Sequence, residues 1–371
     1  METDLMTTVA SPVAPADIQK ELNRIWESLE TTNVTRACLF NLIFFTKKNS
    51  RIPYMQRIAQ KVVEKFPSRV IFITVDPDAK DNFLKTGVSI LSSSKGEFDV
   101  SCDYISIETG GASNEKIPFL LLPHILPDLP VYLLWGQDLK DQDPLFSQIE
   151  PFAGRLIFDS ETTDNLPQFA VKILKQHELS GCDIADLNWA RMESWREMFS
   201  LAFHSQERLD QIGRSQKIAL TYNSRGTPFF CHTQIQALYF QAWLACQLNW
   251  SFKSLSKDKG ALSFIYSHKG GNVEITLSHA EYDNLPPGLI LSAEILTSEK
   301  EHFAFTRNLD ILHHVTCVHS TSSKCDLPAH YVLTKAESGH SLVKEISHRG
   351  TSEHFLNVLH LIKTMDSLKC S

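Results

Sequence analysis

The sequence predicts an α/β domain with an open, mostly parallel, Rossmann-like sheet, followed by an α+β domain with a largely antiparallel sheet. In the first half, near-continuous apolar runs alternate with helical segments, which is typical of a parallel sheet with crossover helices. In the second half, helices precede short strands separated by Gly and Pro turns, which favours an antiparallel sheet. A length of 371 residues also suits two domains better than one.

The N-terminal half contains runs that are apolar on both faces, as expected of strands covered by helices on either side. ACLFNLIFF, residues 37–45, is the clearest of them, and only Asn41 interrupts it. Residues 77–97 are polar and rich in Gly and Ser, which indicates a loop. The expected strands are 37–45, 69–76, 98–108, 129–135 and 155–160, and the expected helices are 17–31, 51–66, about 143–149 and 165–178.

Ser180-Gly181-Cys182 is the expected hinge, and the pattern changes after it. We therefore expect a mobile N-terminus over 1–16, an α/β domain over 17–180 and an α+β domain over 181–371. The elements expected beyond the hinge are helices at 186–204, about 206–213, 233–250 and about 351–368, and strands at 217–223, 262–267, 272–278, 289–296, 303–308 and 311–318.

Composition excludes several classes of function. The net charge is −7, and no basic stripe is visible, so general binding to nucleic acid is not expected. The eight cysteines show no close CxxC pair, and the N-terminus lacks the order of a secretory signal. No apolar run reaches the ~20 residues of a membrane span. We expect a cytoplasmic protein without a membrane contact.

Motifs for chemistry are missing. There is no GxGxxG, P-loop or GxSxG sequence, and residues 46–51, which follow the first apolar strand, contain no glycine. We expect no catalytic residue, cofactor or metal ion. Trp135 is the last residue of an apolar strand. Its ring either lines a crevice at the carboxyl end of the strand or packs in the core. The best metal candidate is a His-rich strand and loop containing His313, His314, Cys317, His319 and Cys325.

The segment 186–203, DLNWARMESWREMFSLAF, is amphipathic but carries polar groups on its apolar side. On a single helix capped by Asp186, Arg191 and Arg196 share a broad arc with Trp189 and Trp195. Burying a guanidinium without a partner is costly, so both arginines need carboxylates or a second surface. The segment is therefore a core helix, a binding face rich in Trp and Arg, or a helix that joins the two domains.

Seven stretches of the sequence belong together: TRACLFNLIFF (35–45), FPSRV (66–70), CDYISIE (102–108), LPDLPVYLLW (126–135), RLIFDS (155–160), ADLNWARMESWREMF (185–199) and ALYFQAWLACQLNW (237–250). In their order and spacing they resemble the glucose-6-phosphate dehydrogenase assembly protein OpcA family. The most specific part is Asp186-Leu187-Asn188-Trp189-Ala190-Arg191 followed by Trp195-Arg196-Glu197. The chain departs from the family pattern at Phe66, where the family usually has a His, and at Leu134-Trp135, where the family usually has two tryptophans.

The resemblance implies a non-catalytic protein that binds glucose-6-phosphate dehydrogenase and promotes its active oligomer in the oxidative pentose-phosphate pathway. The alternatives are an enzyme or sensor for a sugar phosphate or nucleotide, acting at the N-terminal crevice, and a scaffold with other partners. We expect the 186–203 helix to join the domains, with direct contact to the dehydrogenase as the second role. The residues expected to form this interface are Asp186, Asn188, Trp189, Arg191, Trp195 and Arg196, with Arg36, Arg69 and Trp135 as weaker candidates.

Overall fold

The computed structural model describes residues 10–30, 34–93, 99–139, 143–228, 232–258, 260–333, 340–348 and 350–365. The chain divides into two compact units, each of three segments. The linear limits 17–180 and 181–371 stay a prediction about independently folding domains. Unit 1 comprises Met1–Asp159, Gln176–Leu187 and Ser338–Gly350, and unit 2 comprises Ser160–Lys175, Asn188–Glu337 and Thr351–Ser371.

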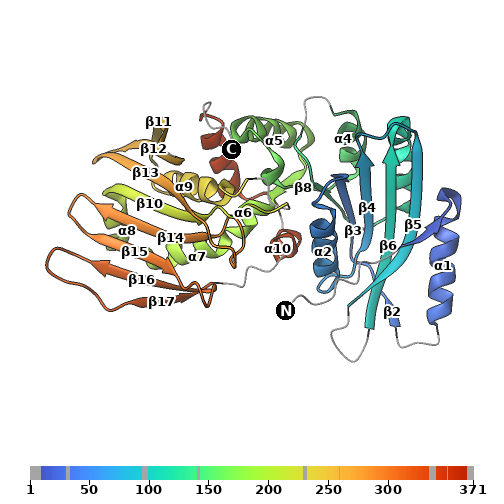
Figure 1. Ribbon diagram of the computed structural model, residues 1–371, viewed down its shortest axis with the longest axis horizontal. Coiled ribbons are helices and arrows are strands. Elements are labelled where there is room, and N and C mark those ends of the chain that lie inside the picture. Colours follow the sequence, from blue (N-terminus) through green and yellow to red (C-terminus); the bar gives the residue numbers. More distant parts are fainter. Residues whose placement is uncertain are drawn as a thin grey trace. The chain divides into compact units, whose positions relative to one another are not determined.

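Unit 1 is built on sheet A, whose described strands run in the order β1-β5-β6-β4-β3-β7-β8-β9, with β2 beside β6 (Figure 1). All neighbouring pairs from β6 to β9 are parallel, and β5 is antiparallel to β6. The strands are β1 Ser11–Val13, β2 Val34–Arg36, β3 Asn41–Lys47, β4 Arg69–Asp76, β5 Phe83–Ser93, β6 Asp99–Gly110, β7 Val131–Trp135, β8 Arg155–Phe158 and β9 Asp183–Asp186.

This order confirms the predicted Rossmann-like sheet. From β3 the chain adds β4 and β6 on one side and β7, β8 and β9 on the other, so the order reverses between β3 and β7. In open α/β sheets, ligands bind at the carboxyl ends of the strands beside such a reversal. The apolar runs are buried as expected, since β3 is covered along nearly its whole length.

The loop predicted over 77–97 was wrong in its centre. Residues 83–93 form β5, which pairs along its length with β6. At Gly87 an added Cβ atom would lie 2.9 Å from Ser106 Oγ and 3.0 Å from Ala10 Cβ, so this glycine marks a close approach between strands. Ser11–Val13 pair with β5 in the region predicted to be a mobile terminus; residues 1–9 lie outside the described part.

The helices of unit 1 include one from a distant part of the sequence. Helix α10 packs against α2, and its Glu345 carboxylate accepts a hydrogen bond from the buried Arg155 at 2.8 Å. Arg155 also donates to the carbonyl oxygens of His348 and Gly350, so the C-terminal segment completes this unit. The helices are α1 Ile18–Leu29, α2 Ile52–Val63, α3 Ile117–Leu121, α4 Pro144–Ile149 and α10 His340–Ser347. Helix α5, Leu166–Ser180, belongs partly to each unit.

Unit 2 is built on sheet B, and its order confirms the predicted antiparallel sheet. The order is β11-β12-β13-β10-β14-β15-β16-β17, in which only β10 and β13 are parallel (Figure 1). The strands are β10 Ser215–Asn223, β11 Ser251–Asp258, β12 Ala261–His268, β13 Gly271–Ala280, β14 Ile290–Thr297, β15 His302–Arg307, β16 His314–Ser320 and β17 Ala329–Val332.

Aromatic side chains join one face of sheet B to its helices. Phe199 of α7 packs at 4.6 Å from Phe305 of β15 and at 4.9 Å from Phe240 of α9 (ring centroids). Such aromatic contacts stabilise a core beyond their buried area. The helices are α6 Leu187–Arg191, α7 Glu193–Ala202, α8 Gln206–Gly213, α9 Ile235–Gln247 and α11 Glu353–Ile362, of which α6 begins in unit 1.

Candidate functional site

The segment predicted as one helix over 186–204 forms a strand end and two helices, so the single-helix prediction was wrong. Asp186 is the last residue of β9 and is buried, and α6 begins at the next residue. A tight turn at Met192 ends α6: its backbone N–H donates to Trp189 O, and its carbonyl accepts from Trp195 N, both three residues apart. The predicted apolar side is kept across this break, since Trp189 and Trp195 are buried and Arg191 and Arg196 are half-buried.

Arg191 is held inside unit 2 by polar groups. Its Nη1 donates to Glu161 Oε2 at 3.0 Å and to Asn188 Oδ1 at 2.6 Å. Asn188 in turn donates to Ser160 Oγ at 3.1 Å. The Glu161 carboxylate is fully buried, so its charge needs this cation close by. A carboxylate partner for Arg191 was expected, and Glu161, just after β8, is that partner.

Arg196 stacks on a tryptophan from the preceding helix. Its guanidinium carbon lies 3.5 Å from the Trp189 ring centroid, and Nη1 donates to Trp189 O at 2.5 Å. A planar cation over an indole face is a favourable arrangement, stronger when water is excluded. Trp189 also packs against Phe355 of α11, with ring centroids 5.5 Å apart. The ring therefore links α6, α7 and α11 within unit 2.

Trp195 lies in the aromatic core of unit 2. Its ring packs against Phe240 at 5.7 Å, and the Arg307 guanidinium lies 5.5 Å from its centroid. Burial lowers the pKa of Arg307 to about 10. Trp195 therefore offers a partner little surface. The exposed residues of α7 are Glu197, Ser200 and Leu201, and Leu201 is 62% exposed.

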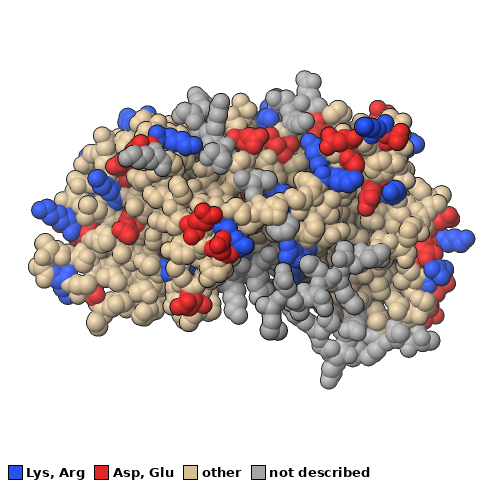
Figure 2. Space-filling view, in the orientation of Figure 1, with Lys and Arg blue, Asp and Glu red and all other residues tan. Residues whose placement is uncertain are grey.

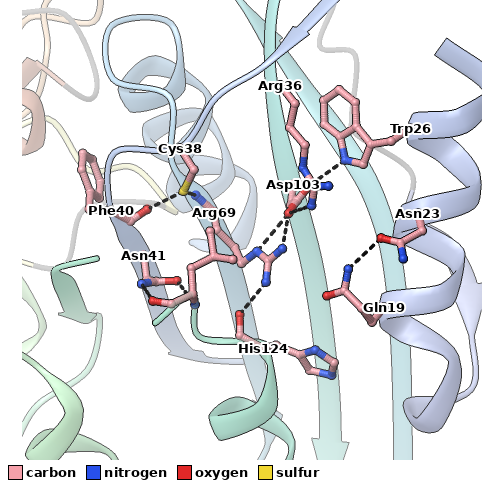
Figure 3. Close-up of polar contacts among 11 residues, drawn as sticks. Gln19, Asn23, Trp26, Arg36, Cys38, Phe40, Asn41, Arg69, Asp103 and His124 are labelled. Carbon is pink, nitrogen blue, oxygen red and sulfur yellow. Dashed lines mark hydrogen bonds and ion pairs between the residues drawn. The ribbon is translucent and has the colours of Figure 1, made fainter. Parts of the chain in front are cut away.

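The structure brings the two weaker arginine candidates together in unit 1, on a carboxylate that sequence reasoning missed. Arg36 Nη2 donates to Asp103 Oδ2 at 2.8 Å, and the buried Arg69 donates to the same oxygen through Nε at 2.9 Å and through Nη2. Trp26 Nε1 donates to Asp103 Oδ1 at 2.7 Å. Figure 3 shows these donors converging on Asp103 from α1, β2 and β4.

This cluster is a network of ion pairs and hydrogen bonds centred on the Asp103 carboxylate in unit 1. Burial alone raises the pKa of Asp103, but the charge of Arg69 and the hydrogen bonds from Arg36, Arg69 and Trp26 hold it below its usual value. Arg69 Nη1 also donates to His124 O at 3.0 Å. Arg36 is 41% exposed and lies 5.1 Å from the Trp26 ring centroid, so one edge of the cluster reaches the surface.

The carboxyl edge of sheet A holds the third candidate, Trp135. Its ring is fully buried and stacks on Phe45 at 4.0 Å, with Phe146 edge-on at 4.9 Å. It is a core residue at this edge. Beside it, the buried Arg51 Nη2 donates to the buried Asp159 carboxylate at 2.5 Å. Arg51 follows β3 and Asp159 follows β8, so the ion pair spans the end of β7.

These residues do not fit the dinucleotide that many Rossmann folds bind at this edge. Pyrophosphate binding needs a glycine-rich turn and free backbone N–H groups at the start of the following helix. Here the N–H of Arg51 donates to Asn49 Oδ1, that of Ile52 donates to Asn49 O, and Pro53 has none. The carboxylate at the end of β4, Asp76, pairs with Lys48 at 2.8 Å.

The His-rich strand and loop do not assemble a metal site. Within the described ranges no group of three or more His, Cys, Asp or Glu side chains is placed to hold a metal ion. Cys317 is buried in β16 and His314 is exposed, as the alternation of a strand requires. His319 instead contacts Asp326 at 2.7 Å.

The fold defines a protein of the class with a Rossmann-type unit and a second unit on an antiparallel sheet. A 3-ketoreductase of Actinomadura kijaniata has a similar fold, with a TM-score of 0.50 and 12% identity over 88% of this chain and 97% of that chain. The WlbA dehydrogenase of Thermus thermophilus aligns with a TM-score of 0.47 at 12% identity over 90% of this chain and 96% of that chain. At such low identity the likeness concerns the fold alone.

The sequence matches two models of one family, described as the N-terminal and C-terminal domains of a glucose-6-phosphate dehydrogenase subunit, over residues 59–175 and 182–359. The OxPP cycle protein OpcA of Nostoc punctiforme is 27% identical over 207 residues, 55% of this chain and 43% of that protein. Its counterpart in Synechocystis is 28% identical over 210 residues, 55% of this chain and 42% of that protein. The chain belongs to the OpcA family, and it aligns with less than half the length of these relatives.

Asp103, Glu161 and the Arg51–Asp159 pair were missed by sequence reasoning. The usable signal was a lone acid inside or directly after an apolar strand, as at CDYISIE and RLIFDS. A carboxylate in such a position needs a cation, and only the fold shows which arginine supplies it.

Proposed function

We propose that this chain is a non-catalytic assembly factor that binds glucose-6-phosphate dehydrogenase and promotes its active oligomer in the oxidative pentose-phosphate pathway of the cytoplasm. The family models support this, since both are named for a subunit of that enzyme. The observation that carries the non-catalytic part is the carboxyl edge of sheet A, where Arg51, Asp159 and Pro53 stand in place of a dinucleotide cradle.

Two further observations concern other classes of partner. Figure 2 shows Lys and Arg interspersed with Asp and Glu on the visible face, without the single-signed stripe that nucleic acid binding requires. No helix in the described ranges is long and apolar enough to cross a membrane. The alternative is a sugar-phosphate or nucleotide site in the N-terminal crevice, and such a ligand bound to the purified protein would favour it.

Activation follows from differential affinity. A partner that binds the active dehydrogenase oligomer more tightly than the inactive form shifts the population toward the active form. Half-maximal activation then falls at the dissociation constant for the active oligomer divided by the fraction of the enzyme that is active without the partner. Within unit 2, the α6–α7 segment is proposed to hold the recognition surface in shape through Glu161, Arg191 and Trp189, and a domain-joining role for this segment also stays a proposal.

The test combines activity and mass. Purified dehydrogenase from the same organism is titrated with this protein, and initial rates and light-scattering mass are measured at each step. We expect a saturable rise in rate together with a larger dehydrogenase assembly. Unchanged rate and unchanged mass at saturating protein would refute the proposal. The protein alone, assayed with glucose 6-phosphate and NADP⁺, serves as the control and is expected to show no turnover.

A further inference from the structure

In the described part of unit 2, the helices pack on one face of sheet B. Helices α7 and α9 cover the face that carries Phe264, Tyr266, Phe303 and Phe305. In the middle of β10 the alternate residues Ile218, Leu220 and Tyr222 are buried, so the residues between them point to the opposite face. The same alternation holds along β12, β13, β14 and β15. We call this second surface the open face.

The pairing register fixes which residues of the open face are neighbours. Ala219 lies between Thr276 of β13 and Glu294 of β14, and Glu294 lies beside Ala304 of β15. Small side chains therefore lie on both sides of Glu294 in the middle of the face. The residues of the open face on the five central strands are Ser263, Ile265, Glu274, Thr276, Ser278, Lys217, Ala219, Thr221, Ser292, Glu294, Leu296, His302, Ala304 and Thr306.

The open face carries few charged side chains. Glu274 Oε1 accepts a hydrogen bond from Ser263 Oγ at 2.6 Å, and Lys217 is its direct neighbour on β10. Glu294 lies 3.6 Å from His302 Nε2, an ion pair only when His302 is protonated. A large apolar side chain, Leu296, is 38% exposed beside Lys217. An exposed surface with so few charges is typical of a contact surface.

The area suits a stable contact. Eight strands at roughly 4.8 Å spacing give a width of about 38 Å, and about six residues per strand give a length of about 20 Å. The flat area is therefore about 750 Å² per partner, close to the ~800 Å² per partner of a standard protein interface. Small side chains allow two such sheets to approach to ~10 Å with interdigitated residues.

We propose that the open face is the dimer interface between two copies of this chain, stacked sheet on sheet about a twofold axis. A twofold contact places the same surface on both partners, so the face must be compatible with itself in shape and charge. A face with many small side chains, few charges and the neighbouring pair Lys217 and Glu274 meets this condition. The inference is independent of the proposed function, because it concerns this protein without any dehydrogenase.

Light scattering at tens of micromolar protein tests the proposal. We expect the wild-type chain at twice its 42.0 kDa mass. Thr276→Arg and Thr306→Arg place a cation on the open face where the paired neighbours are uncharged: Ser263 and Ala219 for the first, Ser292 and Thr316 for the second. Because the interface is twofold, each variant buries two added cations, one from each copy of the chain. We therefore expect the dimer dissociation constant to rise at least about a hundredfold.

The matched control is Ser200→Arg, which adds the same side chain at an exposed position of α7, a helix on the covered side of the sheet. It is expected to keep the dimer mass, and circular dichroism checks that all variants fold. A monomeric wild type overturns the proposal, and so does a dimer that survives both open-face variants or that Ser200→Arg also dissociates. A wild type that is monomeric alone but loses dehydrogenase binding in both open-face variants assigns the face to that enzyme instead.

Discussion

At the residue scale, each arginine that sequence reasoning flagged, Arg36, Arg69, Arg191 and Arg196, has a specific internal partner. Arg69 and Arg36 share Asp103, Arg191 reaches Glu161, and Arg196 lies over Trp189. A buried ion pair contributes little net stability relative to apolar residues, but losing one partner is costly. These side chains therefore determine the local conformation more than the overall free energy of unfolding.

Asp103→Asn is expected to destabilise unit 1 by about 3–5 kcal/mol at pH 7, because the buried Arg69 loses its counter-charge. The pH dependence has a definite sign. The pKa of Asp103 is lowered in the folded state, so its contribution is fully present above the unfolded pKa of about 3.9 and is lost as pH falls through the folded value. Urea denaturation at pH 7 and at about pH 3 should therefore show a large gap between wild type and variant that narrows in acid.

The control for this measurement is Asp76→Asn, which removes the half-buried partner of the exposed Lys48. Exposed pairs are screened by water and salt, so we expect little change. Two results would contradict an electrostatic role for Asp103. One is an equal loss of stability in both variants, and the other is a stability difference between wild type and Asp103→Asn that is as large at about pH 3 as at pH 7.

At the element scale, periodicity located α6 and α7 but not the turn between them. The residues from Leu187 to Ala202 are good helix formers without Gly or Pro, so nothing local predicts the break at Met192. The break depends on tertiary contacts, in which Arg191 reaches Glu161 while α7 presents Phe199 to sheet B. Similarly, the polar residues of β5 give it a weak β-propensity, so the sequence did not predict this strand. The strand forms because it pairs with β6 along its length.

If α7 contacts the dehydrogenase directly, its exposed residues carry the contact. Leu201 is the large apolar side chain there, and a charge at its position would have to be buried unpaired. We expect Leu201→Arg to raise the concentration for half-maximal activation about tenfold, with unchanged stability. The measurement is the activity titration described above.

The matched variant for α7 is Leu209→Arg on α8, a leucine that is also exposed. Its activation curve is expected to overlay that of the wild type. Overlay of the Leu201→Arg curve as well would remove α7 from the interface and leave the segment with its structural role. Trp195→Ala is not a useful probe, since Trp195 lies in the core beside Phe240 and its loss would damage the fold.

At the scale of the whole molecule, both sheets were predicted from sequence, because their strands carry buried apolar runs or clear alternation. The division of the chain was harder to predict. Sequence patterns are read along the chain, whereas compact units form from contacts, and three separate segments build each unit. The pairing of Arg155 with Glu345 illustrates this, since 190 positions separate the two residues and no local signal connects them.

A division at the predicted hinge therefore gives a direct test of how the chain folds. A fragment of residues 1–180 lacks β9 and α10, and so leaves the β8 edge unpaired and Arg155 without the Glu345 carboxylate. Exposed sheet edges aggregate, and a buried cation without its partner costs about 3–5 kcal/mol. We expect this fragment to be insoluble or unfolded by circular dichroism, although it spans the predicted domain 17–180.

The control is the full chain carrying Arg155→Met and Glu345→Leu. This variant loses the buried ion pair but keeps β9 and α10, so we expect it to fold and to unfold cooperatively. A well-folded fragment would show that the predicted domain 17–180 folds on its own and that unit 1 does not need the C-terminal segment.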